Sequence, residues 1–127
     1  MIVVDASAIL AIHLDEPERE AFRERILQAT GIMSPVNYWE ALVRAQAFDG
    51  EAGRDKIVQL IDFLDIEIVA VDVETAELAA HAFARFGKRA PAKLNMGDCF
   101  AYALAKSRGA PLLYKGGDFA KTDIEAA

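Results

Sequence analysis

Four acidic side chains occupy positions at which carboxylates commonly do chemistry, and they are Asp5, Glu40, Asp98 and Asp118. Two of them follow apolar runs that predict buried strands, over residues 2–4 and 112–114. The other two fall in the early turns of predicted helices. Like charges cannot stay ionised close together without a cation, and all-oxygen ligation favours Mg²⁺ or Mn²⁺ over Zn²⁺. The four positions therefore predict a divalent-cation site, provided that the fold brings them together.

Three of these carboxylates also have a simple structural interpretation. Asp5 could cap the helix that follows it, and Asp118 could be an ordinary turn residue. Asp98 lies three residues after Asn95, which is the spacing of a capping box with aspartate in place of glutamate. We therefore expect Asn95 to support Asp98. Only the combination of the four acids favours a metal site over these local roles.

Glu40 is the most informative of the four, because it falls on an apolar helical face. The expected core-facing stripe, read at the 3.6-residue period, consists of Val36, Trp39, Val43 and Ala47. An ionised glutamate on such a stripe costs several kcal/mol unless its charge is compensated. A metal ion is one compensator, and a salt bridge to Arg44 at the edge of the stripe is the alternative.

The elements that must position these side chains alternate between strands and helices. We expect strands over residues 2–4, 31–34, 66–71 and 112–114. We expect helices over residues 7–14, 17–29, 35–48, 54–64, 73–86 and 96–107, with breaks at Gly50 and Gly53. Such alternation predicts a parallel sheet covered on both faces within a single domain, residues 1–127. In this fold class a site lies beyond the carboxyl ends of the strands, where all four acids would meet.

Charge is distributed unevenly along the chain. The net charge of −6, taken alone, argues against a partner held by phosphate contacts. Residues 1–77 hold sixteen acidic and six basic residues, a balance of −10, whereas residues 78–122 hold two acidic and eight basic residues, a balance of +6. The second stretch could present a basic surface to a polyanion, although solvated helix faces would produce the same pattern.

Nothing in the sequence predicts a membrane or secreted protein. No apolar run approaches the ~20 residues that a spanning helix needs, and the first five residues do not resemble a signal peptide. Cys99 is the only cysteine, so no internal disulfide can form and a cytoplasmic location is expected. His13 and His81 have no ligand-like neighbours at helical spacing, and we expect structural roles for both.

Four segments resemble, in order, the motifs of PIN-domain ribonucleases, specifically the toxins of VapBC-type toxin–antitoxin pairs. The segments are residues 3–7 (VVDAS), 37–41 (NYWEA), 94–105 (LNMGDCFAYALA) and 111–119 (PLLYKGGDF). Together they span nearly the whole chain, and their order is more specific than any one of them. The sequence differs from the family's motifs at two places. Gly117 precedes Asp118 where relatives often carry a second acid, and residues 89–91 replace a frequent Gly-x-His-Pro.

The resemblance implies a three-layer α/β/α sandwich with a central parallel sheet, and RNA cleavage that depends on Mg²⁺ or Mn²⁺. By position, Asp5, Glu40 and Asp98 match the three core acids of the family, and Asp118 matches a more variable fourth. Ser7 matches a hydroxyl that supports the first aspartate. The expected reaction is in-line attack of an activated water on an RNA phosphodiester, leaving a 5′-phosphate.

The resemblance also implies partners. It predicts a homodimer and a small antitoxin protein that blocks the site. The basic residues that we expect to hold RNA phosphates are Arg85, Lys88, Arg89, Lys93 and Lys115.

Three other functions fit parts of the pattern. A phosphatase of the haloacid dehalogenase type also begins with a strand-terminal aspartate, but it needs a second one where this chain has Ser7. A response-regulator-like module needs its acceptor aspartate after a middle strand, and the strand expected over 66–71 leads only to Asp72. A PIN fold retained purely as a binding module is the third.

Overall fold

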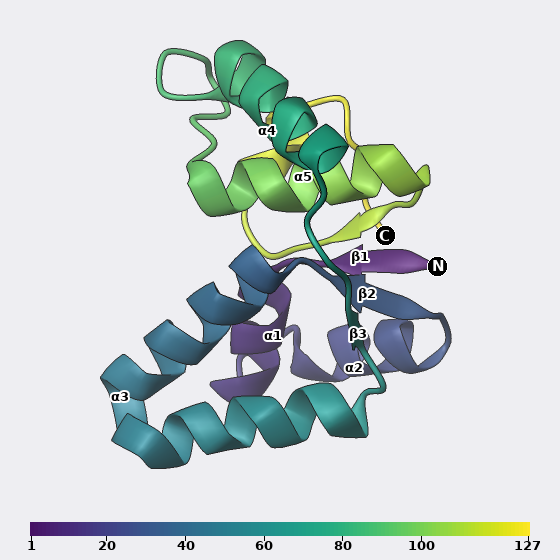
Figure 1. Ribbon diagram of the computed structural model, residues 1–127. Helices are drawn as coiled ribbons and strands as arrows, with labels where there is room; N and C mark the ends of the chain where they lie inside the picture. The colour runs from purple at the N-terminus through teal and green to yellow at the C-terminus, as the bar shows by residue number, and fades with distance from the viewer.

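The computed structural model describes residues 1–127 and is built around a parallel four-stranded sheet with strand order β3-β2-β1-β4 (Figure 1). The strands are β1 (Ile2–Val4), β2 (Gly31–Met33), β3 (Glu67–Ile68) and β4 (Leu112–Leu113). In the centre of the sheet, Val3 pairs with Ile32 of β2 and with Leu112 of β4. The strand order reverses between β1 and β4, and such switch points are where parallel sheets place their sites.

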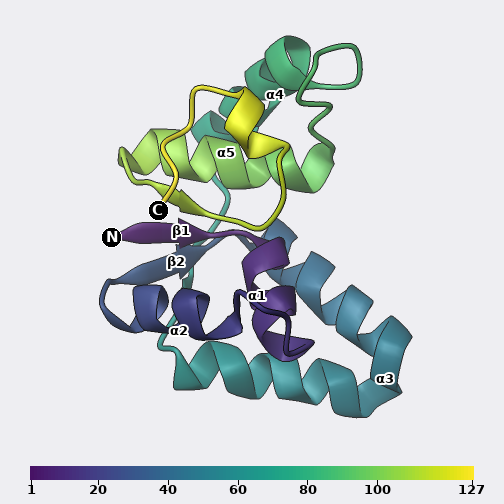
Figure 2. The ribbon, with the colours of Figure 1, turned by 180° about the vertical axis from the view of Figure 1, so that it is seen from behind.

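Helices cover both faces of this sheet. They are α1 (Ala6–His13), α2 (Arg19–Leu27), α3 (Pro35–Phe63), α4 (Val73–Phe86) and α5 (Met96–Arg108), with a short 3₁₀ helix η1 (Phe119–Lys121). Figures 1 and 2 show α1, α2 and α3 on one face and α5 on the other, with α4 stacked on α5. This arrangement confirms the three-layer α/β/α sandwich. No helix has the length and apolar character needed to cross a membrane.

The short strands divide the core into two parts by their alternation. Ile2 and Val4 point into the cluster beneath α1 and α3, whereas Val3 points into the cluster beneath α5. Side chains on successive residues of a strand face opposite sides of the sheet, so a run of three apolar residues feeds both clusters. The continuous apolar pattern of β1 therefore reflects burial on both faces.

Helix α3 is longer than expected and is sharply bent. The turn lies at Asp49 and Gly50, and Gly50 has φ +64° and ψ −148°, a conformation that is nearly exclusive to glycine. The expected break at Gly50 is confirmed. The expected break at Gly53 is wrong, because this residue is helical and buried. A Cβ at Gly53 would collide with the Ala45 carbonyl, so its glycine lets the two arms of α3 pack closely.

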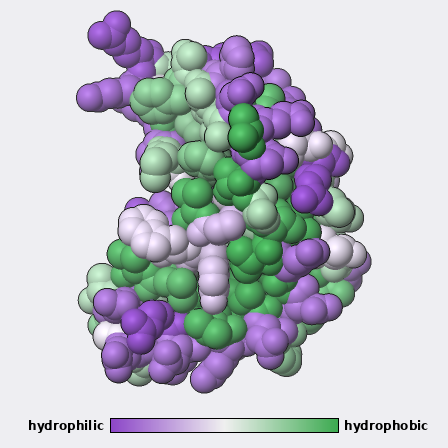
Figure 3. Space-filling model, viewed as in Figure 1, coloured by the Kyte–Doolittle hydropathy of each residue, from purple (hydrophilic) through white to green (hydrophobic).

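The predicted core-facing stripe of α3 is also wrong. Trp39 is 59% exposed and Val43 is 44% exposed. The face of the first arm that is buried carries Asn37, Ala41 and Ala45 instead. Small side chains let this arm lie close to its neighbours, and the larger apolar side chains are left on the outer face. Figure 3 shows hydrophobic side chains in a band across the middle of this view.

The expected strand over residues 66–71 is shorter in the structure. Only Glu67–Ile68 forms β3, and one further bond from the Val69 N–H to the Met33 carbonyl continues the pairing. β3 is an edge strand whose only partner is β2. Because β2 ends at Met33, residues 70 and 71 have no strand to pair with.

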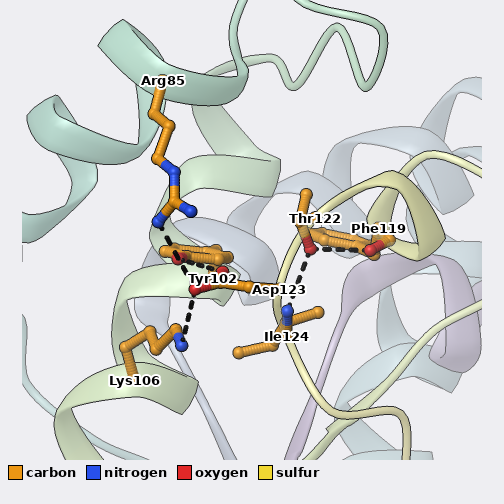
Figure 4. A network of polar contacts seen from close by, with 7 residues as sticks. All are labelled: Arg85, Tyr102, Lys106, Phe119, Thr122, Asp123 and Ile124. Atoms are coloured by element: carbon orange, nitrogen blue, oxygen red, sulfur yellow. Dashed lines mark hydrogen bonds and ion pairs between the residues drawn. The ribbon is translucent and has the colours of Figure 1, made fainter.

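The C-terminal segment covers the free edge of β4. The Leu112 N–H donates to the Glu125 carbonyl, and the Ala127 N–H donates to the Leu112 carbonyl. Asp123 fastens this segment to α5, because it accepts a hydrogen bond of 2.5 Å from the Tyr102 hydroxyl and lies 3.1 Å from Lys106 Nζ (Figure 4). The Tyr102 hydrogen bond lowers the pKa of Asp123, and burial raises the pKa of Tyr102 to about 12.

Candidate active site

Asp5 lies at the end of β1 and forms the first part of the site. Its Oδ2 accepts hydrogen bonds from the Ser7 N–H (3.0 Å) and from the Ser7 hydroxyl (2.6 Å). The Lys115 N–H in turn donates to Ser7 Oγ at 2.9 Å, so the ends of β1 and β4 are joined through Ser7. Asp5 is therefore the N-cap of α1, as its structural interpretation predicts, with one oxygen fully engaged.

The other oxygen of Asp5 is free. Oδ1 is buried without a hydrogen-bond partner, and the residue as a whole is 4% exposed. Burial raises the pKa of Asp5 to about 6, against the lowering effect of the two Ser7 hydrogen bonds, and the charges of Asp98 and Glu40 raise it further. A buried carboxylate oxygen without a partner is unusual in a native protein and indicates a place for a cation or a proton.

Glu40 approaches from the first arm of α3, where its helix is tied to α5. The Asn37 side chain donates from Nδ2 to the Gly97 carbonyl at 2.9 Å, and Asn37 is completely buried. A Cβ at Gly97 would lie 2.8 Å from Glu40 Oε1, so glycine is needed for this approach. Burial raises the pKa of Glu40, the charge of Arg44 lowers it, and the charge of Asp98 raises it.

Asp98 is held at the start of α5 by the capping box that its spacing predicts. The Asp98 N–H donates to Asn95 Oδ1 at 2.9 Å, and the Asn95 N–H donates to Asp98 Oδ2 at 3.0 Å. Burial raises the pKa of Asp98, the Asn95 backbone hydrogen bond lowers it, and the charge of Asp118 raises it. One oxygen of Asp98 thus serves its helix, and the carboxylate still interacts with the other acids.

All four acids line one cleft of about 350 Å³ beyond the carboxyl ends of β1 and β4. Ser7 and Asn95 line it as well, so every predicted ligand and supporting residue is brought together. Asp118 is the most exposed of the acids. Lys115 also lines the cleft, but its Nζ is paired with Glu16 at 2.6 Å and Glu18 at 3.4 Å.

The other predicted phosphate-binding residues lie outside the cleft. Lys88 and Arg89 are in the loop between α4 and α5, and Lys93 lies in the same loop just before α5. All three are exposed and make no ion pair. Arg85 lies 3.4 Å from Asp123 and is partly neutralised. In Figure 3, long hydrophilic side chains project at the end of the molecule where this loop lies.

Sequence reasoning did not single out two residues that shape the cleft. Asn37 and Gly97 connect the helices of Glu40 and Asp98. Arg44, named from the sequence as a possible partner of Glu40, places a positive charge beside both acids. The contact between Asn37 and Gly97 joins residues 60 positions apart and has no local signal.

The donor set of the cleft fits a hard divalent cation. The acids supply oxygen only, and Asp5 Oδ1 is a buried oxygen without a partner. The chain holds no group of three acidic, histidine or cysteine side chains already arranged around a common metal position. Mg²⁺ needs no such cage, because it is commonly held by one or two carboxylates and keeps several waters.

The sequence as a whole matches a known family. Residues 2–125 match the model of the PIN domain. This chain belongs to the PIN-domain family. Its PIN domain is 39% identical over 127 residues to a protein named ribonuclease VapC from Mycolicibacterium smegmatis, covering 98% of each chain.

Other relatives of this PIN domain have similar names. It is 41% identical over 126 residues to ribonuclease VapC30 of Mycobacterium tuberculosis, covering 97% of this chain and 95% of the relative. It is 40% identical over 141 residues to a VapC ribonuclease of Rhizobium meliloti, covering 98% and 99%. The crystal structure of M. tuberculosis VapC20, described as a sarcin–ricin-loop-cleaving toxin, has the same fold, with a TM-score of 0.82, 14% identity and coverage of 100% and 98%.

Proposed function

We propose that this PIN domain is an endoribonuclease dependent on Mg²⁺ or Mn²⁺, and the toxin of a type II toxin–antitoxin pair that acts in the cytoplasm. The observation that carries the proposal is the convergence of Asp5, Glu40 and Asp98 on one cleft, with Asp5 Oδ1 buried and unpartnered. Relatives of nearly full length that are named VapC ribonucleases support the same reaction class over a phosphatase or a response-regulator-like module.

The four carboxylates have distinct parts in this proposal. Asp5 offers Oδ1 to the cation, while Ser7 holds Oδ2 and fixes the orientation of the group. Glu40 and Asp98 offer oxygens from α3 and α5, and Asp118 supplements them from the rim. The cation supplies activation of water and stabilisation of charge on the leaving oxygen.

Basic residues would bring the RNA to these carboxylates. Lys88, Arg89 and Lys93 have no ion-pair partner and are free to contact phosphates. Lys115 and Arg85 are candidates of a second rank, because acids already neutralise them in part. Arg44 lines the cleft and adds a positive charge close to the scissile position.

The direct test is RNA cleavage by the wild-type chain and by Asp5→Ala and Asp98→Asn variants, with Mg²⁺, Mn²⁺ or EDTA. We expect metal-dependent cleavage with 5′-phosphate products, and a loss of at least about a hundredfold in either variant. Asp55→Asn is the matched control, because Asp55 is exposed on the second arm of α3. This control should cleave like the wild type, and the loss of cleavage in the two site variants would exclude a contaminating nuclease.

Other outcomes separate the alternatives. Cleavage that survives in the Asp98→Asn variant would contradict the site assignment. Metal binding by calorimetry without cleavage of any RNA would favour a PIN fold that acts only as a binding module. A stable phosphoprotein after acetyl phosphate treatment would instead favour a phosphatase or a response-regulator-like module.

We also propose a homodimer, in addition to a protein antitoxin that blocks the cleft. An entirely apolar groove of about 400 Å³ lies between α4 and α5 and includes Phe83, Met96 and Phe100. Met96 is 62% exposed and Phe83 is 49% exposed, and exposed apolar surface of this kind is typical of protein interfaces. Light scattering of the wild type and a Phe83→Glu variant tests the proposal, which predicts a dimer that the variant weakens.

A further inference from the structure

Asp118 is the acid of the cleft whose position is least fixed by its own contacts. Asp5 and Asp98 accept hydrogen bonds from nearby residues, whereas the Asp118 side chain makes no such capping bond. The two residues before it are Gly116 and Gly117, and a Cβ at either would meet nothing within 4 Å, so packing does not hold the chain there. The residues after Asp118 must therefore determine where its carboxylate lies.

The chain that follows Asp118 is attached to the core on the α5 side of the sheet. Phe119 is 3% exposed and belongs to the apolar cluster on that side. The Thr122 hydroxyl donates to the Phe119 carbonyl at 2.6 Å and accepts a hydrogen bond from the Ile124 N–H at 3.2 Å. Figure 2 shows η1 and the yellow segment after it beside α5. These bonds join the turn that carries Asp118 to the residues on either side of Asp123.

Asp123 makes three polar contacts with α4 and α5. Its Oδ1 accepts a hydrogen bond of 2.5 Å from the Tyr102 hydroxyl, and its Oδ2 lies 3.1 Å from Lys106 Nζ and 3.4 Å from the Arg85 guanidinium (Figure 4). Tyr102 is 6% exposed, whereas the Lys106 and Arg85 side chains are 39% and 64% exposed. A hydrogen bond from a buried hydroxyl to a carboxylate is stronger than ion pairs at exposed positions. We refer to the bond between Tyr102 and Asp123 as the Asp123 anchor.

Helix α5 carries one acid of the cleft and also the donor of this anchor. Asp98, Tyr102 and Lys106 follow one another at a spacing of four residues, so they lie along one side of the helix. The charge of Asp118 raises the pKa of Asp98, so the two acids are close enough to interact. Asp98 is thus placed by α5 directly, and Asp118 is connected to the same helix through the Asp123 anchor.

We propose that Tyr102 and Asp123 are positioning residues for Asp118, and that the bond between them determines where this carboxylate lies in the cleft. The inference rests on the proposed function, in which Asp118 supplements the other acids around a divalent cation. Without the anchor, the C-terminus would still pair with Leu112. That pairing lies beyond Asp123 in the chain, so the packing of Phe119 would be the main contact left to hold the turn.

The first test measures the anchor in EDTA and needs neither metal nor RNA. Tyr102→Phe removes the hydroxyl and keeps the ring. Amide hydrogen exchange should become about tenfold faster at Lys121 and Thr122, whose N–H groups make the hydrogen bonds of η1, because one hydrogen bond to a charged group is lost. Tyr114→Phe is the matched control, since the Tyr114 hydroxyl makes no hydrogen bond. Unchanged exchange in Tyr102→Phe would overturn the proposal.

The second test asks whether the anchor acts through Asp118. We expect Tyr102→Phe to lower Mn²⁺ affinity by about threefold to tenfold in calorimetry, and Asp118→Asn to lower it by about tenfold. The double variant should bind Mn²⁺ no more weakly than Asp118→Asn alone, because the anchor has no other route to the cation. Asp123→Asn keeps an acceptor for the Tyr102 hydroxyl and should lose less affinity than Asp123→Ala.

The two tests separate this proposal from the proposed function. An equal loss of Mn²⁺ affinity on Tyr102→Phe with and without Asp118→Asn would show a general structural role and overturn the positioning role. No effect of Asp118→Asn on Mn²⁺ affinity would overturn it as well, although the three other acids could still bind the ion. Absence of Mn²⁺ binding by the wild type would contradict the proposed function, and the exchange rates in EDTA would then decide whether the anchor holds the turn of Asp118.

Discussion

The burial of Asp5 opposes the folding of the metal-free chain. Its pKa is raised from 3.8 to about 6, chiefly by burial, so the folded state holds this proton more tightly than the unfolded state does. Between these two pH values the folded state binds more protons, and the stability contributed by this group falls as pH rises. Above about pH 6 the whole penalty is present, of the order of 2–3 kcal/mol.

An Asp5→Asn variant should therefore be more stable than the wild type when no metal is present. Urea unfolding in EDTA should show a gain of about 1–3 kcal/mol near pH 7 and little gain near pH 4, where Asp5 is protonated in the folded wild type. Asp55→Asn, at an exposed position, should show no such pH dependence. A gain of the same size at both pH values would contradict the explanation by charge.

Gly97 is expected to control the position of Glu40. A methyl group at this residue would lie 2.8 Å from Glu40 Oε1, so Gly97→Ala should displace that carboxylate. We expect Mn²⁺ affinity by calorimetry to fall about tenfold or more, as it does when support of a ligand is removed. Gly117→Ala is the matched control, because a Cβ there has nothing within 4 Å. Unchanged Mn²⁺ affinity in Gly97→Ala would contradict the role.

The acids of the cleft could be predicted from the sequence because each has a local signal. Asp5 follows a buried strand, and Asp98 belongs to a capping box with Asn95. Asn37 could not be predicted, because its partner is the carbonyl of a residue 60 positions away. The unpartnered Oδ1 of Asp5 likewise depends on how tightly the surrounding elements pack, and no spacing in the sequence encodes that.

Helix α3 shows what the periodicity of apolar residues can and cannot predict. The existence of both arms is evident from the pattern, but the buried face is not. The stripe of large apolar residues that includes Trp39 and Val43 is exposed, and Ala41 and Ala45 are buried. A helix close to its neighbours needs small side chains at the contact, so the largest side chains need not mark the core. The fold class was predictable because it depends only on the order of strands and helices.

The bend in α3 depends on the backbone conformation of Gly50. Gly50 has φ +64° and ψ −148°, which a residue with a Cβ adopts only at a cost of about 1–3 kcal/mol. Gly50→Ala should lower the free energy of unfolding by this amount in urea unfolding experiments.

The companion variant at Gly50 tests the conformation itself. Asparagine tolerates the left-handed helical region but not the region of Gly50, so Gly50→Asn should be no better than Gly50→Ala. At Gly109, with φ +59° and ψ +34°, asparagine should be better than alanine. Recovery of stability by asparagine at Gly50 would show that the bend has another backbone conformation.

Across the whole molecule, the charge asymmetry of the sequence becomes an asymmetry between layers. Residues 1–77, with a net charge of −10, include the layer of α1, α2 and α3. Residues 78–122, with a net charge of +6, include α5 and most of α4, which stacks on it. The candidate active site lies between the two layers, because residues of α1, α3 and α5 line it. RNA is therefore expected to approach along the α4–α5 side, where the unpaired cations of the loop lie.

Salt dependence tests this direction of approach. Neutralising Lys88 and Arg89 together to Gln should weaken RNA binding and reduce the steepness of log affinity against log salt, by about 0.7 for each phosphate of a single strand that the protein no longer neutralises. Arg25→Gln with Arg108→Gln removes the same charge at the ends of α2 and α5 that precede the strands, away from the cleft. If the two double variants changed the slope equally, net charge alone would explain RNA binding and the loop would have no specific role. A reduced slope only for Lys88 and Arg89, with Mn²⁺ affinity unchanged, would separate the RNA-holding surface from the carboxylates.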